Sequence, residues 1–138
     1  GSEMCIRDRY GILKEIHMRQ DQFEPYPEAQ QFLAALKEMG LYVIIASIRD
    51  EEARDATERW LKKYELMYDE LHLSNDKTVL FNDVWAIVDD SIWTLDKAAH
   101  AGIVRTGLRN VWNDGRGHPL FDTLPQILDY LKRQYSSK

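Results

Sequence analysis

Four polar side chains lie just beyond apolar segments of the chain, and their types suit phosphate chemistry. They are Ser47, Lys77, Asp89 and Asp90. Mg²⁺ prefers oxygen ligands, usually one or two carboxylates completed by phosphate oxygens and water. A lysine ammonium neutralises phosphoryl oxygens, and a serine hydroxyl donates a hydrogen bond to them. The set therefore predicts a site for a phosphorylated ligand and a divalent cation.

Each of these residues also has an ordinary structural explanation. Ser47 could end a strand or cap a helix, Lys77 could be a solvated loop lysine, and Asp90 could be a helix N-cap. Arg49 could reach a substrate phosphate or lie on the surface at a helix start. Adjacent carboxylates such as Asp89 and Asp90 repel each other unless a cation or a helix N-terminus offsets the repulsion. The joint pattern is thus more specific than any single residue.

The apolar pattern predicts the elements that position these residues. Residues 32–39 have helical spacing that ends at Gly40, and the apolar runs 41–46 and 84–88 predict strands buried on both faces. The other expected elements are a helix after Asp50, a strand over 70–73, a helix over 92–101, a strand over 103–108 and a helix opened by Thr123 and Pro125. This alternation predicts an α/β fold, a three-layer, Rossmann-like arrangement with a mostly parallel sheet. Ligands of such sheets bind beyond the carboxyl ends of the strands.

Length and composition narrow the class of protein. The 138 residues suit one domain, and a content of 44% hydrophobic and 30% charged residues argues against disorder. A net charge of −5 argues against a nucleic-acid polymer as partner. The longest apolar run is too short to span a bilayer, and the single cysteine, Cys5, excludes an internal disulfide. We therefore expect a cytoplasmic protein without membrane contact.

The order and spacing of the polar residues resemble those of the haloacid-dehalogenase-like (HAD) hydrolase superfamily. The segment VIIAS, ending in Ser47, is similar to its second motif, NDKT with Lys77 to its third, and AIVDDS with Asp89 and Asp90 to its fourth. The segments DKAAHAGI and FDTLPQILDYL are also similar, so the resemblance covers residues 25–132. Lys77 and Asp89 are only 12 positions apart, which looks most like the 5′(3′)-deoxyribonucleotidase-like branch.

The resemblance implies a Mg²⁺-dependent phosphohydrolase that acts on a small phosphate ester such as a nucleoside monophosphate. In that family scheme Ser47 hydrogen-bonds a phosphoryl oxygen, and Lys77 neutralises the phosphoryl charge and secures the nucleophile. Asp89 and Asp90 hold the cation directly or through water. The cap that selects the substrate in such enzymes is truncated or absent in this sequence.

The first motif of the family, a strand ending in Asp-x-Asp, is not found. Its first carboxylate is the nucleophile that takes the phosphoryl group. Asp8 and Asp21 are the candidates, and neither follows a buried strand pattern. Asp8 lies in SEMCIRDR, which resembles translated adapter read-through in metagenomic gene calls. We therefore expect a foreign, disordered segment over residues 1–9, one domain over 10–134, a tail over 135–138, and little phosphatase activity.

Two explanations of the missing motif remain open: a gene fragment, or a natural pseudo-enzyme that keeps the fold as a non-catalytic binding module. Without its first strand, the sheet would carry unpaired backbone groups in its middle, which predicts a homo-oligomer through that exposed edge. The polar loop 112–118 is expected to rim the same sheet edge, either touching substrate or acting as a plain loop. Trp93 is expected to pack, and the four histidines show no metal-ligand spacing.

Overall fold

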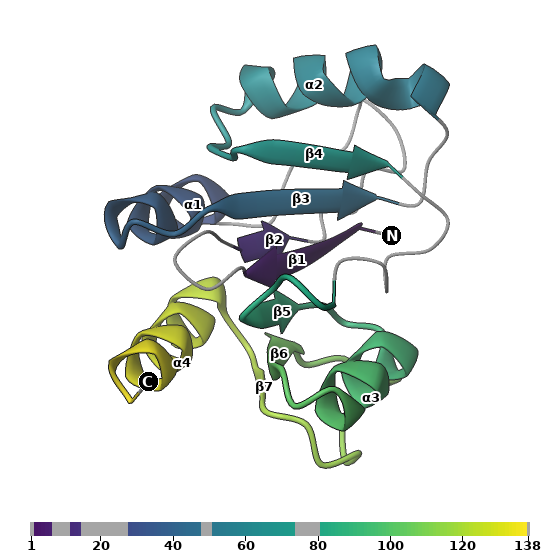
Figure 1. The fold of residues 1–138 in the computed structure, drawn as a ribbon, viewed down its shortest axis with the longest axis vertical. Helices are drawn as coiled ribbons and strands as arrows, with labels where there is room; N and C mark the ends of the chain where they lie inside the picture. The colour runs from purple at the N-terminus through teal and green to yellow at the C-terminus, as the bar shows by residue number, and fades with distance from the viewer. Residues whose placement is uncertain (1, 7–11, 15–27, 48–50, 74–80, 138) are drawn as a thin grey trace.

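The computed structural model describes residues 2–6, 12–14, 28–47, 51–73 and 81–137. These residues form a mixed α/β fold in which one or two strands separate successive helices (Figure 1). The strands are β1 (Ser2–Ile6), β2 (Ile12–Lys14), β3 (Val43–Ser47), β4 (Glu70–Leu73), β5 (Ala86–Val88), β6 (Val104–Leu108) and β7 (Leu120–Phe121). The helices are α1 (Ala29–Glu38), α2 (Arg54–Lys63), α3 (Ile92–His100) and α4 (Leu124–Ser136), with a 3-10 turn, η1 (Glu51–Ala53), before α2.

The strands are ordered β4-β3-β1-β5-β6-β7 across the sheet, and β2 pairs with β5 off this path. The pairs β3–β4, β5–β6 and β6–β7 are parallel, whereas β1 is antiparallel to both β3 and β5. If the six strands of the path are numbered along the chain, their order is 3-2-1-4-5-6, that of doubly wound α/β sheets. The arrangement is consistent with the expected Rossmann-like fold, apart from the reversed direction of β1.

The N-terminal segment corrects two expectations. Residues 1–9 were expected to be disordered, but Ser2–Ile6 forms β1 in the centre of the sheet. The middle of the sheet was expected to be open, but β1 pairs there with β3 on one side and β5 on the other. Five residues suffice for this pairing because the backbone supplies the hydrogen bonds whatever the side chains are. The predicted oligomer interface at an open central edge is therefore not supported.

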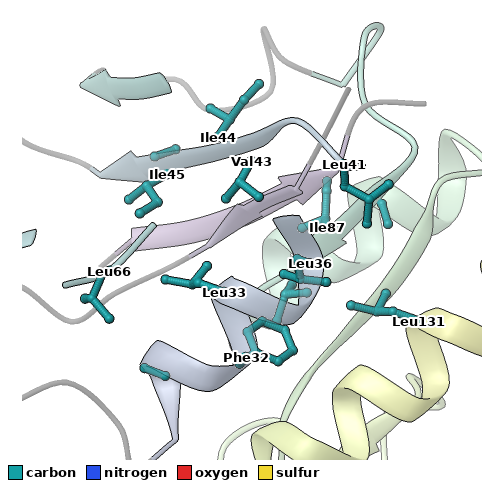
Figure 2. Close-up of a cluster of buried hydrophobic side chains, with 14 of the residues drawn as sticks. Phe32, Leu33, Leu36, Leu41, Val43, Ile44, Ile45, Leu66, Ile87 and Leu131 are labelled. Carbon is teal, nitrogen blue, oxygen red and sulfur yellow. The ribbon is translucent and has the colours of Figure 1, made fainter. Parts of the chain in front are cut away.

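The core forms where α1 packs on the central strands. Phe32, Leu33 and Leu36 lie on one face of α1 and point toward the sheet (Figure 2). The helix ends at Gly40, which has φ +79°: its N–H donates to the Lys37 carbonyl and the next N–H to the Leu36 carbonyl. Glycine adopts this left-handed conformation without a Cβ clash.

Both faces of β3 are buried. Val43 and Ile45 point toward α1, and Ile44 points the other way (Figure 2). All three are fully buried. A strand covered on both faces reads as a continuous apolar run, as the sequence predicted. Elsewhere α1 packs against α4, α4 packs against β6 and β7, and α3 packs against β6.

Two helix starts are defined by side-chain caps. The Ser91 hydroxyl accepts from the Thr94 N–H, so the N-cap of α3 is Ser91 and the suggestion of Asp90 was wrong. Thr123 and Gln126 form the reciprocal capping box that opens α4.

Trp93 was expected to pack, but its position in the first turn of α3 leaves it 60% exposed.

The amino end of the sheet is held by a charged network. Asp69, just before β4, accepts from the Lys37 ammonium at 2.5 Å and from the Val43 N–H at 2.6 Å. The same ammonium donates to the Leu41 carbonyl at 2.8 Å. These contacts tie the end of α1 to the starts of β3 and β4. Among the described helices, none is long and apolar enough to cross a membrane.

Candidate functional site at the carboxyl edge of the sheet

The strand register aligns β3 and β5 through β1, so that β5 ends level with Ile45 of β3. Met4 of β1 lies opposite Ile45 of β3 and opposite Val88 of β5. Two residues further along the chain are Ser47, the last residue of β3, and Asp90, which lies beyond the end of β5. Because one strand lies between them, the backbones of β3 and β5 are about 10 Å apart, twice the spacing of neighbouring strands. Two of the predicted site positions thus lie at the carboxyl edge, and the strand order reverses between β1 and β5.

Asp89 is the most unusual residue of this edge. It follows β5 directly and is only 2% exposed. Its Oδ1 accepts from the N–H of Asp90 at 2.7 Å and from the N–H of Ser91 at 3.3 Å. Within the described part of the chain, Oδ2 is buried and has no hydrogen-bond partner. A buried carboxylate oxygen without a donor costs free energy unless a proton or a cation compensates it.

The Asp89 backbone is packed equally tightly. Its N–H donates to the Thr106 carbonyl of β6 at 3.0 Å. A Cβ built on Gly107 would lie 1.8 Å from the Asp89 carbonyl oxygen, so this position in β6 accepts no side chain without movement. A glycine inside a strand often marks such a close backbone approach. The close approach at Gly107 was not predicted from the sequence, although a glycine inside an apolar strand pattern indicates such an approach.

The loop between β6 and β7 contacts the same edge, as expected. The Asp90 carbonyl accepts from the Asn113 amide at 3.1 Å and from the Trp112 indole N–H at 3.3 Å. Trp112 is 55% exposed, whereas Asn113 is fully buried. Neither residue was singled out for a contact with Asp90 from the sequence, because the contact joins positions more than twenty residues apart.

The far end of this loop is fixed by a histidine. Arg105 of β6 donates from Nε to Nδ1 of His118 at 2.7 Å, so Nε2 carries the proton and donates to Asp96 of α3 at 2.7 Å. Burial raises the pKa of the nearby Tyr130 phenol, and the positive charge of Arg105 works against that rise. Both ring nitrogens of His118 are thus hydrogen-bonded within the protein.

The remaining predicted residues cannot be placed. Lys77, Arg49 and Asp8 lie outside the described residues, as does the expected N-cap Asp50. Of the predicted site residues, the structure thus describes the backbone of Ser47, at the end of β3, and Asp89 and Asp90, after the end of β5. The roles assigned to all of these residues remain predictions.

At Asp89, a single buried carboxylate oxygen without a described donor is open to a cation. In the part of the chain that the structure describes, no group of three or more His, Cys, Asp or Glu side chains could hold a metal ion. A cage made only of protein ligands, such as Zn²⁺ or Ca²⁺ prefers, is thus not formed by these residues. Mg²⁺ is commonly held by one or two carboxylates and otherwise by water and phosphate. The buried Oδ2 of Asp89 suits that mode.

No protein-family model and no curated protein matches the chain.

Proposed function

We propose that this chain is a HAD-like domain whose carboxyl sheet edge binds Mg²⁺ together with a small phosphate ester, such as a nucleoside monophosphate. The observation that carries the proposal is Asp89, a buried carboxylate with one oxygen lacking a donor among the described residues. Its position after β5, beside the reversal of strand order, is where α/β sheets bind ligands. The resemblance of the motifs around Ser47, Lys77 and Asp89 supports the same conclusion.

The proposed roles follow from residue chemistry. Asp89 holds the cation directly, and Asp90 holds it directly or through water. Lys77 and the Ser47 hydroxyl bind phosphoryl oxygens, and Arg49 reaches the same group. Bound Mg²⁺ neutralises phosphate charge in such sites. Three-layer packing of the helices is part of this proposal, and burial of both faces of β3 supports it.

We propose further that the chain binds its ligand without hydrolysing it. In the HAD scheme, the phosphoryl group is taken by a carboxylate nucleophile at the end of a central strand. In the structure the central strand is β1, whose direction is opposite to that of β3 and β5. The carboxyl end of β1 therefore lies at the edge of the sheet away from Asp89. Mg²⁺-dependent turnover of p-nitrophenyl phosphate that is lost in Asp8→Asn would contradict this inactivity.

Calorimetric titration with MgCl₂, with and without inorganic phosphate, tests the binding. We expect saturable Mg²⁺ binding in the wild type that is lost in Asp89→Asn. Asp129→Asn, which changes an exposed carboxylate on α4, is the matched control and should bind as the wild type does. Equal Mg²⁺ affinity in the wild type and Asp89→Asn would overturn the site.

A further inference from the structure

Asn113 is a buried polar side chain in an otherwise exposed loop. Val111 and Trp112 before it are 95% and 55% exposed, and Asp114 after it is exposed, whereas Asn113 is 0% exposed. Burial of an amide is favourable only when its hydrogen bonds are satisfied. The hydrogen-bond partners of the Asn113 amide therefore show which backbone groups this side chain fixes in place.

The Asn113 amide joins the ends of two strands. Its Nδ2 donates to the carbonyl of Leu108, the last residue of β6, at 3.0 Å and to the carbonyl of Asp90, beyond β5, at 3.1 Å. Its Oδ1 accepts from the N–H of Asn110 at 2.7 Å. Both amide protons and the amide oxygen are thus used. A carboxylate of the same shape would face two carbonyl oxygens without a proton to donate.

The turn from Asp89 to Ser91 is consequently held from two sides. The N–H groups of Asp90 and Ser91 donate to Asp89 Oδ1, and the Asp90 carbonyl accepts from Asn113. With the peptide after Asp90 fixed, Oδ1 stays directed at the backbone. Oδ2 is then the carboxylate oxygen that remains for a ligand.

We propose that Asn113 is a positioning residue for the Asp89 carboxylate: by holding the Asp90 carbonyl it keeps the turn closed and Oδ2 available to a divalent cation. The role in cation binding rests on the proposed function, whereas the hold on the turn does not. Residues that orient metal ligands typically change metal affinity about 10- to 100-fold when substituted. The loop between β6 and β7 is in this way coupled to the carboxyl edge.

Amide hydrogen exchange measured by NMR tests the hold on the turn without any metal. We expect the Asp90 and Ser91 amides to exchange at least about tenfold faster in Asn113→Ala and Asn113→Asp, relative to the Val43 amide, which is bonded to Asp69 at the other end of the sheet. Asn110→Ala is the matched control, because it removes a 3.3 Å bond to the Leu108 carbonyl and none to Asp90. If Asn113→Asp fails to fold, Asn113→Ser, which keeps one donor, is measured instead.

Titration with MgCl₂ then tests the consequence for the cation. We expect the Kd for Mg²⁺ to rise about tenfold or more in the Asn113 variants. The Asn113 side-chain NH₂ signal should shift with Mg²⁺ in the wild type and stay fixed in Asp89→Asn.

The outcomes separate the two proposals. Unchanged relative exchange at Asp90 and Ser91 overturns the role of Asn113, whatever Mg²⁺ does. Faster exchange with an unchanged Kd overturns its role toward the cation. A wild type that binds no Mg²⁺ overturns the proposed function and, with it, the cation part of this inference, while the exchange data still decide the hold on the turn.

Discussion

Asp69 and Asp89 are carboxylates at opposite ends of the sheet, and they differ in both burial and hydrogen bonding. At the amino end, Asp69 is partly exposed, yet its Oδ2 accepts from an ammonium and from a backbone N–H. At the carboxyl end, Asp89 is almost fully buried, yet its Oδ2 accepts from no described residue. The more costly location thus has the fewer hydrogen bonds to that oxygen.

The comparison distinguishes Asp69, a carboxylate that stabilises the fold, from Asp89, a carboxylate that we propose binds a ligand. An unsatisfied buried polar group costs about 1–3 kcal/mol, and more when it is charged. The amino end avoids this cost, so its network contributes to the free energy of unfolding. At the carboxyl end, Asp89 Oδ2 bears this cost, which a bound cation would relieve under the proposed function. Exceptions to local rules of this kind concentrate at functional sites.

The largest effect is expected from Gly107→Ala. The new Cβ would overlap the Asp89 carbonyl oxygen, so β5 and β6 must move apart. We expect unfolding in urea to show a loss of about 3 kcal/mol, typical of severe overpacking. Gly115→Ala is the control: no atom lies within 4 Å of its Cβ, and only its φ of +76° is unfavourable, worth about 1 kcal/mol. Equal losses would show that the close approach at Gly107 does not constrain Asp89.

Asp69→Ala should have the next largest effect. It leaves the Lys37 ammonium and the Val43 N–H without this partner, and hydrogen bonds to charged groups contribute about 1.5–3 kcal/mol. We expect a loss of about 2 kcal/mol in urea unfolding, with Mg²⁺ affinity unchanged. Asp129→Ala on the surface of α4 should change stability by less than about 0.5 kcal/mol. Weaker Mg²⁺ binding in Asp69→Ala would mean that the two ends of the sheet are coupled.

The sequence predicted the regular elements well because their signals are local. The apolar stripe of α1 with Gly40 behind it, the run that becomes β3, and the Thr123 cap of α4 each depend on neighbouring residues. β1 was missed because its pairing with β3 and β5 is a backbone property with no apolar pattern in SEMCI. Long-range backbone pairing leaves little trace in a single sequence.

The candidate site was predictable only in part, for a similar reason. The paired acids after the β5 run were a local signal, so the sequence indicated Asp89 and Asp90 as candidates. Asn113 lies 23 positions after Asp90, and only the folded loop shows that its amide reaches the Asp90 carbonyl. Which oxygen of Asp89 lacks a donor is likewise a property of the folded turn.

Asp89→Asn should have a smaller effect on stability than Asp69→Ala, and of opposite sign. The amide keeps an oxygen that accepts from the Asp90 and Ser91 N–H groups and removes a buried charge. In the absence of divalent cations we expect a gain of about 1 kcal/mol in urea unfolding. With saturating Mg²⁺ the wild type should recover at least as much, because a ligand that binds only the folded state stabilises it. A loss of stability in the metal-free variant would mean that the charge of Asp89 is satisfied without a cation.

The smallest effect is expected from Trp112→Phe, which tests the comparison within the carboxyl end itself. Trp112 and Asn113 donate to the same Asp90 carbonyl, but the indole bond is 3.3 Å long and exposed to water, whereas the amide bond is 3.1 Å long and buried. Water replaces an exposed donor at little cost, so we expect a loss of about 0.5 kcal/mol and a Kd for Mg²⁺ within about twofold of the wild type. Isothermal titration and urea unfolding measure both quantities. If Trp112→Phe weakened Mg²⁺ binding as much as Asn113→Ala, the exposed indole would be holding the Asp90 carbonyl, and burial of Asn113 would not be what keeps the turn closed.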